Sequence, residues 1–200
     1  MQRFNIYKKS KKFNWSNTLI IFSLIISLFV ISLLKQYFFN PEKGLFDEII
    51  MKLMLGLFLL GLILKTIGLT KPKILDEEFS GFLEFYKDYI IIDDERFKIE
   101  EIKSIEISNN DYYGKPQEAT GFDSSLSNGV NNQILLRLNS GKTKSYNFEL
   151  YNEHDMTKIE EELFYYYSKG KIDFFELAKI LKIESKTEIE EFRNQISLLK

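Results

Sequence analysis

The chain contains no cysteine and only one histidine among its 200 residues. The lack of cysteine excludes thiolate catalysis, thiolate metal sites and disulfide bonds, and the single His154 excludes a metal centre built from several histidines. The phosphate-loop pattern G-x-x-x-x-G-K-S/T does not occur either. We therefore expect no metal site, no cofactor and no catalytic residue.

Carboxylates are plentiful, and a pair of them could supply acid and base chemistry if an apolar pocket raised the pKa of one. Glu160, Glu161 and Glu162, however, lie on a predicted helix whose opposite face is apolar, so we interpret them as its solvated side. His154 precedes them without a serine elbow or a cysteine to activate. The composition thus favours a binding protein over an enzyme.

Charge is distributed unevenly along the chain. Residues 1–73 carry a net charge of +8, whereas residues 74–200 carry −10. Anionic lipid attracts nearby basic side chains, and an acidic domain gains nothing from lying flat on it. Nucleic acid is disfavoured as a partner because phosphate binding requires a positive surface.

Two apolar stretches stand near the N-terminus, at residues 18–35 and 49–69. A helix needs about 20 mostly apolar residues to cross a bilayer, because backbone polar groups must be satisfied within it. Lysine and arginine flank the pair on the outer sides, while the turn at residues 36–48 holds one lysine against three acids. The positive-inside rule therefore predicts a multi-pass inner-membrane protein with both termini in the cytoplasm.

Two alternatives remain for this region. A basic start followed by an apolar stretch also resembles a signal peptide, although no small-x-small cleavage site follows and a second apolar stretch does. Ser23 and Ser27 form a small-xxx-small pair that could pack the first span on the second or on a second copy of the chain.

The remaining sequence predicts strands first and helices afterwards. Short alternating segments separated by tight turns predict six antiparallel strands, at residues 82–86, 89–92, 96–99, 103–108, 133–138 and 143–148. Asn152 is the expected cap of an amphipathic helix that ends at Gly170, and a shorter helix follows at residues 172–181. The capping box of Ser185 and Glu188 predicts a third helix.

Strands in this order and spacing, followed by an amphipathic helix, resemble a pleckstrin-homology-like (PH-like) fold. The runs 82–108 and 133–169 are similar to bacterial membrane-anchored proteins that carry such a domain after two spans. The resemblance implies a transmembrane hairpin plus an α+β domain: an antiparallel β-sandwich or half-barrel, plugged by a C-terminal helix and used for binding and assembly. The predicted organisation is an N-terminus (1–17), span (18–35), turn (36–48), span (49–69), linker (70–80), PH-like domain (81–169) and C-terminal helices (170–200).

The resemblance also indicates where a lipid headgroup could bind. Family members that bind inositol phosphates use basic residues on the first strands, and the matching positions here are Lys87, Arg96 and Lys98. Acidic residues occupy the same turns and would repel phosphate. They are Asp88, Asp93, Asp94 and Glu95. We therefore expect a solvated rim of mixed charge there instead of a headgroup site.

The connection at residues 109–132 is unusually long for a compact domain and contains no predicted strand or helix. Paired tyrosines offer amphipathic contact area, and the asparagines offer hydrogen-bond donors and acceptors. The alternative is that these residues merely form turns. The candidate binding residues are Asp111, Tyr112, Tyr113, Lys115, Asn128, Asn131 and Asn132.

Together these patterns predict an integral membrane protein that presents a cytoplasmic PH-like domain for binding or scaffolding. Its expected partners are the bilayer, through two spans, and either another protein or a second copy of itself. The alternative is an accessory or regulatory subunit of a membrane transport or envelope complex, contacted through its transmembrane helices.

Overall fold

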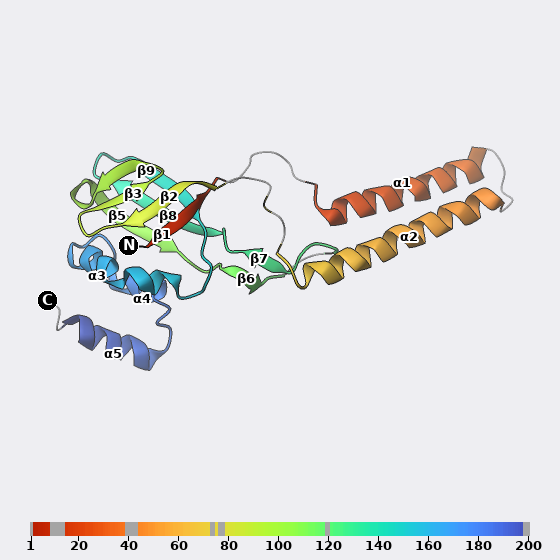
Figure 1. The fold of residues 1–200 in the computed structure, drawn as a ribbon. Coiled ribbons are helices and arrows are strands. Elements are labelled where there is room, and N and C mark those ends of the chain that lie inside the picture. The colour runs from red at the N-terminus through yellow and green to blue at the C-terminus, as the bar shows by residue number, and fades with distance from the viewer. Residues whose placement is uncertain are drawn as a thin grey trace. The chain divides into compact units, whose positions relative to one another are not determined.

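The computed structural model describes residues 2–8, 15–38, 44–72, 75, 79–118 and 121–197 (Figure 1). The chain forms two compact units. The helix unit comprises Lys11–Lys73 and Pro116–Leu126, and the sheet unit comprises Met1–Ser10, Ile74–Lys115 and Ser127–Lys200.

The helix unit contains two long apolar helices, α1 (Asn17–Phe38) and α2 (Leu45–Gly68), which run side by side in Figure 1. The most apolar 18-residue stretches of the two helices have mean hydropathies of 2.5 and 2.1, and both helices are long enough to cross a membrane. Ser23 and Ser27 are exposed, and each hydroxyl donates to a carbonyl of its own helix. The expectation that these serines pack α1 on α2 is therefore wrong.

The sheet unit is built on one seven-stranded antiparallel sheet in the order β4-β3-β2-β1-β9-β8-β5. All six predicted strands are present. The strands are β1 (Arg3–Tyr7), β2 (Phe79–Phe85), β3 (Tyr89–Ile92), β4 (Glu95–Lys98), β5 (Ile102–Ser108), β8 (Asn132–Leu138) and β9 (Thr143–Phe148).

The seventh strand, β1, precedes the two apolar helices in sequence and lies in the middle of the sheet, between β2 and β9. Phe4 and Ile6 point into the core, where the Phe4 ring meets Phe85 and Phe148 edge-on. The sequence predicts no strand at residues 3–7, because five residues next to a basic run are typical of the charged segment that flanks a membrane span. The sheet is therefore assembled from chain segments that precede and follow the two apolar helices in sequence.

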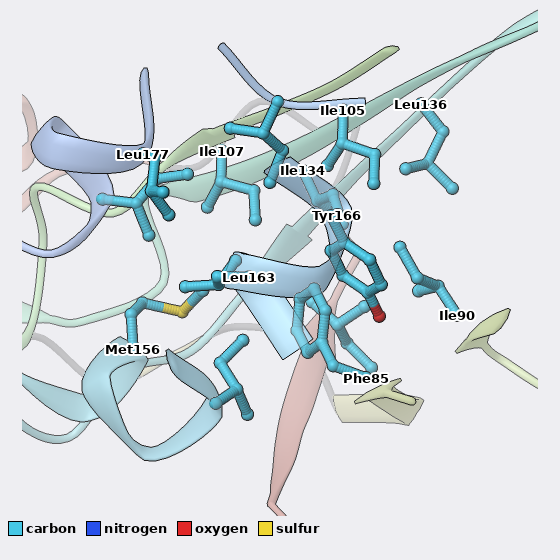
Figure 2. Packing of buried hydrophobic residues seen from close by; sticks show 14 of the residues in the cluster. Phe85, Ile90, Ile105, Ile107, Ile134, Leu136, Met156, Leu163, Tyr166 and Leu177 are labelled. Carbon is cyan, nitrogen blue, oxygen red and sulfur yellow. The ribbon is translucent and has the colours of Figure 1, made fainter. Parts of the chain in front are cut away.

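Helices follow the last strand in the predicted order: a 3-10 turn (Asp155–Ile159), α3 (Glu160–Ser168), α4 (Phe174–Ile180) and α5 (Lys186–Ser197). Leu163 and Tyr166 of α3 lie among buried side chains of the sheet (Figure 2), and the Tyr166 hydroxyl donates to the Tyr86 carbonyl at 2.6 Å. Burial raises the pKa of Tyr166 far above its ordinary value. Phe192 and Ile196 of α5 belong to the same core, so the C-terminal helices pack on this unit.

The ends of these helices differ in part from the prediction. Asn152 does not cap the first helix; the buried Asp155 carboxylate instead accepts the amides of Tyr151 and Asn152 at 2.9 and 2.8 Å. The capping box is confirmed, because Ser185 and Glu188 each accept the backbone amide of the other.

The long connection at residues 109–132 contains regular structure, so the expectation that it has no strand is wrong. It contains a small two-stranded sheet of β6 (Tyr113–Pro116) and β7 (Leu126–Asn128). The base of this hairpin belongs to the sheet unit, and its tip, Pro116–Leu126, belongs to the helix unit. Short strands with glycine and polar residues carry little periodic signal, which explains why they are not predicted.

Candidate functional site

The base of the β6–β7 hairpin is held by buried polar side chains. Asp111 accepts the Ser127 hydroxyl at 2.7 Å and the Asn131 amide at 3.0 Å. Asn132, which is fully buried, accepts the Asp111 amide and donates to the carbonyls of Gly129 and Phe148. Because these polar atoms are already paired within the domain, Asp111 and Asn132 hold the loop and leave little for an external ligand.

The other loop residues of the predicted binding site lie around this base. Tyr112 packs against the core, and Lys115 donates to the Asn110 carbonyl with its ammonium above the Tyr112 ring. Asn128 is half-buried and Asn131 is exposed. The structure therefore brings the predicted residues into one region but gives them different roles.

Tyr113 remains exposed, and its ring lies 6.2 Å from that of Tyr151, which also faces solvent. The nearby Glu149 carboxylate, together with partial burial, raises the pKa of Tyr151 above its ordinary value. The predicted site does not include Tyr151, because this residue follows β9 and is separated from the loop in sequence. This ring pair is an amphipathic surface of the kind that suits protein contacts.

The tip of the hairpin packs on the two long helices. Phe122 is buried, and its ring contacts Phe22 of α1 at 5.7 Å and Phe58 of α2 at 6.1 Å between centroids. Gly61 leaves room for it, since a Cβ there would lie 2.7 Å from the ring. A large apolar side chain of the loop thus fills a gap between the helices.

Polar contacts fix the same tip to the helix ends. Thr18, in the first turn of α1, accepts the Phe122 amide at 2.8 Å and donates to Asp123 at 3.0 Å. Near the end of α2, Lys65 donates to the Asp123 carbonyl and to Ser125, and the Ser125 amide donates to the Gly68 carbonyl. The tip is therefore docked where the chain enters α1 and leaves α2.

The basic residues that the resemblance singled out do not stay together. Lys87 faces Glu161 at 3.5 Å, whereas Arg96 and Lys98 line a hollow of about 550 Å³ beside β4. The segment that follows α3 also lines this hollow and contributes Lys169 and Lys171. The last two were not predicted, because they join the strand residues only through the fold.

The acids that we expected to repel phosphate are largely engaged elsewhere. Asp93 pairs with Lys8 at 2.8 Å, and Glu95 pairs with Lys144 at 3.1 Å. Asp88 lines the hollow but accepts the Tyr165 hydroxyl at 3.3 Å. The hollow nevertheless has a lining of mixed charge, because Asp88 and Glu100 lie there beside the four basic residues.

The side chains considered above for acid and base chemistry lie mostly at the surface of the described part of the chain. Glu160, Glu161 and His154 are exposed, and Glu162 is only half-buried. No group of three or more histidine or carboxylate side chains in the described ranges could hold a metal ion. The geometry thus presents an exposed tyrosine pair and a basic hollow as the candidate binding features.

Comparison of the chain with protein-family models, with curated proteins and with solved structures finds no match. The class that the fold and the candidate site define is therefore a broad one: a chain with two long apolar helices near its N-terminus, an antiparallel sheet and further helices.

Proposed function

We propose that the protein is an integral membrane protein in which α1 and α2 span the bilayer and a PH-like domain is held at the cytoplasmic face for binding and scaffolding. The observation that carries the proposal is the docking of the loop tip at Thr18, Lys65 and Gly68. These three residues lie at the end of the helix pair where the chain enters α1 and leaves α2. The basic flanks expected on the cytoplasmic side lie at the same end.

The sheet topology supports a PH-like assignment. Strands β1 to β4 form one meander, β5, β8 and β9 form a second, and α3 follows the last strand directly. Tyr166 and Leu163 of α3 pack among buried side chains of this sheet (Figure 2). A sandwich closed by a C-terminal helix is what the resemblance implies.

Alkaline extraction of membranes tests the anchor. We expect the intact chain to stay in the membrane pellet, because two apolar helices resist removal once inserted. Ile26→Lys combined with Val30→Lys, both exposed on α1, should release a fraction of the protein, since a lysine at mid-span costs about 3 kcal/mol. Release of the unmodified chain into the soluble fraction would contradict the proposal.

The scaffolding role is tested by co-purification from crosslinked membranes. Tyr113→Ala combined with Tyr151→Ala removes the exposed ring pair, and we expect a partner recovered with the unmodified chain to be lost. Phe175→Ala removes another exposed aromatic ring, on α4, and serves as the matched control. A partner that survives the tyrosine changes but not the control would contradict this choice of surface.

A further inference from the structure

We propose that the Tyr113–Tyr151 ring pair and the Glu149 carboxylate bind an arginine side chain of a partner protein. Both rings are exposed, whereas Glu149 is only 5% exposed, and all three residues belong to the sheet unit. The inference rests on the proposed binding role of this ring pair, and it adds the chemistry of the partner that the pair recognises.

Glu149 is a buried carboxylate without a cation beside it. Two other buried acids, Glu84 and Asp155, pair with Arg3 and Lys158, each at 2.6 Å. Within the described part of the chain, Glu149 forms no ion pair. A buried charge is costly unless an opposite charge or hydrogen bonds compensate it. A cation supplied by a partner is therefore attracted to this position.

The neighbours of the Glu149 carboxylate are neutral. The Asn5 side-chain amide donates to its Oε2 atom at 2.7 Å, and the carboxylate raises the pKa of the neighbouring Tyr151 hydroxyl. The two oxygens of a carboxylate offer about four lone-pair sites. A guanidinium, which has several N–H donors, can bond to the sites that Asn5 and Tyr151 leave open.

The two tyrosine rings supply faces on which a cation can lie. Their centroids are 6.2 Å apart and their planes are inclined by 37°. The Tyr113 amide donates to the Leu150 carbonyl at 2.9 Å, which fixes the backbone of one tyrosine to the residue before the other. Cations are attracted to the faces of aromatic rings, and arginine is found there more often than lysine.

The sheet unit already contains a contact of this type, and the charge of its sequence favours a basic partner. The Arg96 guanidinium lies 4.0 Å from the centre of the Tyr89 ring. Residues 74–200 carry a net charge of −10, which steers a positively charged partner toward the domain. Arginine combines the positive charge that is missing beside Glu149 with a flat surface that can stack on the rings.

Fluorine NMR on the full-length protein in a maltoside detergent tests the proposal. The probe is trifluoroacetyl-Ala-Arg-Ala-amide, and its control is the same peptide with citrulline, which has the shape of arginine but no charge. We expect saturable broadening of the arginine peptide's signal and at least about fivefold weaker binding of the citrulline peptide. Equal binding of the two peptides, or no saturable binding of the arginine peptide, would overturn the proposal.

Variants locate the binding on the protein. Glu149→Gln keeps an oxygen that can accept from Asn5 but removes the charge, so binding should weaken about tenfold. Tyr113→Leu, at an exposed position, should weaken it about threefold, and Tyr113→Phe should restore it because the ring face returns. Glu190→Gln removes a negative charge from the exposed side of α5 and is the matched control. An equal loss in Glu190→Gln would contradict a site at Glu149.

Two results separate this inference from the proposed function. If the crosslinked partner is lost from the tyrosine variants but retained by Glu149→Gln, the ring pair binds a partner without an arginine at this carboxylate, and only the inference fails. Glycerophosphocholine, which carries a quaternary ammonium, serves as a second probe. Tighter binding of glycerophosphocholine than of the arginine peptide would overturn the choice of a protein partner in favour of a lipid headgroup.

Discussion

The ring of Phe122 lies so close to Gly61 that a Cβ on that glycine would be 2.7 Å from the ring. Phe122 belongs to the loop between β6 and β7, and Gly61 lies in α2, two turns before its end. A glycine at this point of an apolar helix gives the loop its docking place. The contact ties a segment of the long connection to the helix pair.

Phe122→Ala should release the loop tip. Removing a buried phenyl ring typically costs about 3–5 kcal/mol, so the Ser125 amide, which donates to the Gly68 carbonyl at 3.1 Å, should exchange at least about tenfold faster. Hydrogen exchange of the detergent-solubilised protein measures this. Phe29→Ala removes an exposed ring of α1 and should leave the exchange unchanged. Equal protection in Phe122→Ala and the unmodified chain would show that the contact does not hold the tip.

Gly129→Ala should destabilise the sheet unit more than Gly141→Ala. Both glycines have positive φ, at 73° and 82°, so each substitution carries the strain of about 1 kcal/mol that an alanine meets there. A Cβ at Gly129 would also meet the Leu150 carbonyl and the Tyr113 amide, whereas the space at Gly141 is open. We expect an added loss of about 1–3 kcal/mol, measured by urea unfolding. Equal losses of unfolding free energy in the two variants would mean that the backbone around Gly129 shifts easily to make room for a Cβ.

Asn132→Ala should cost about 2–3 kcal/mol of unfolding free energy, because it leaves three buried backbone groups with a lost partner. Asn131→Ala, at the exposed neighbour, should cost less than about 0.5 kcal/mol. Thermal unfolding of the two variants separates a structural asparagine from a surface one. A stable Asn132→Ala protein would return Asn132 to the set of candidate binding residues.

Asp155→Asn should reduce stability in a pH-dependent way. Burial acts to raise the pKa of Asp155, but hydrogen bonds from Lys158, Asn152 and Tyr151 outweigh it and lower the pKa below its ordinary value. The stabilisation is therefore present above the unfolded pKa and is lost as the pH falls through the folded pKa. The difference in stability between the unmodified chain and the variant should be about 1–3 kcal/mol near neutral pH and shrink in acid. A difference that stays constant down to about pH 2 would contradict this account.

The sequence predicts those elements whose signal is local. The six strands at residues 82–148 alternate clearly, and the Ser185 and Glu188 capping box needs only four consecutive residues. Strand β1 escapes prediction because its partners, β2 and β9, are about 75 and 140 residues away in sequence, so only the fold reveals that Arg3–Tyr7 fills the middle of the sheet.

The candidate sites are also predicted only in part, because residues distant in sequence come together in them. Arg96 and Lys98 are conspicuous in the sequence, but Lys169 and Lys171 join them only because α3 packs against the sheet. Asp111 and Asn132 look like binding residues because polar side chains in loops often are, yet their hydrogen bonds are internal. Burial and internal hydrogen bonding distinguish a residue that holds a loop from one that could bind a ligand. Neither property can be read from one sequence.

Cysteine accessibility tests the central claim most directly, because the chain has no cysteine of its own and each introduced thiol is unique. Gly44→Cys lies just before α2 and Ser140→Cys lies in the exposed turn between β8 and β9. With a membrane-impermeant maleimide, we predict that Gly44→Cys reacts in intact cells and that Ser140→Cys reacts only after the membrane is permeabilised. Reaction of Ser140→Cys in intact cells, or protection of Gly44→Cys until permeabilisation, would contradict a hairpin that holds its domain in the cytoplasm.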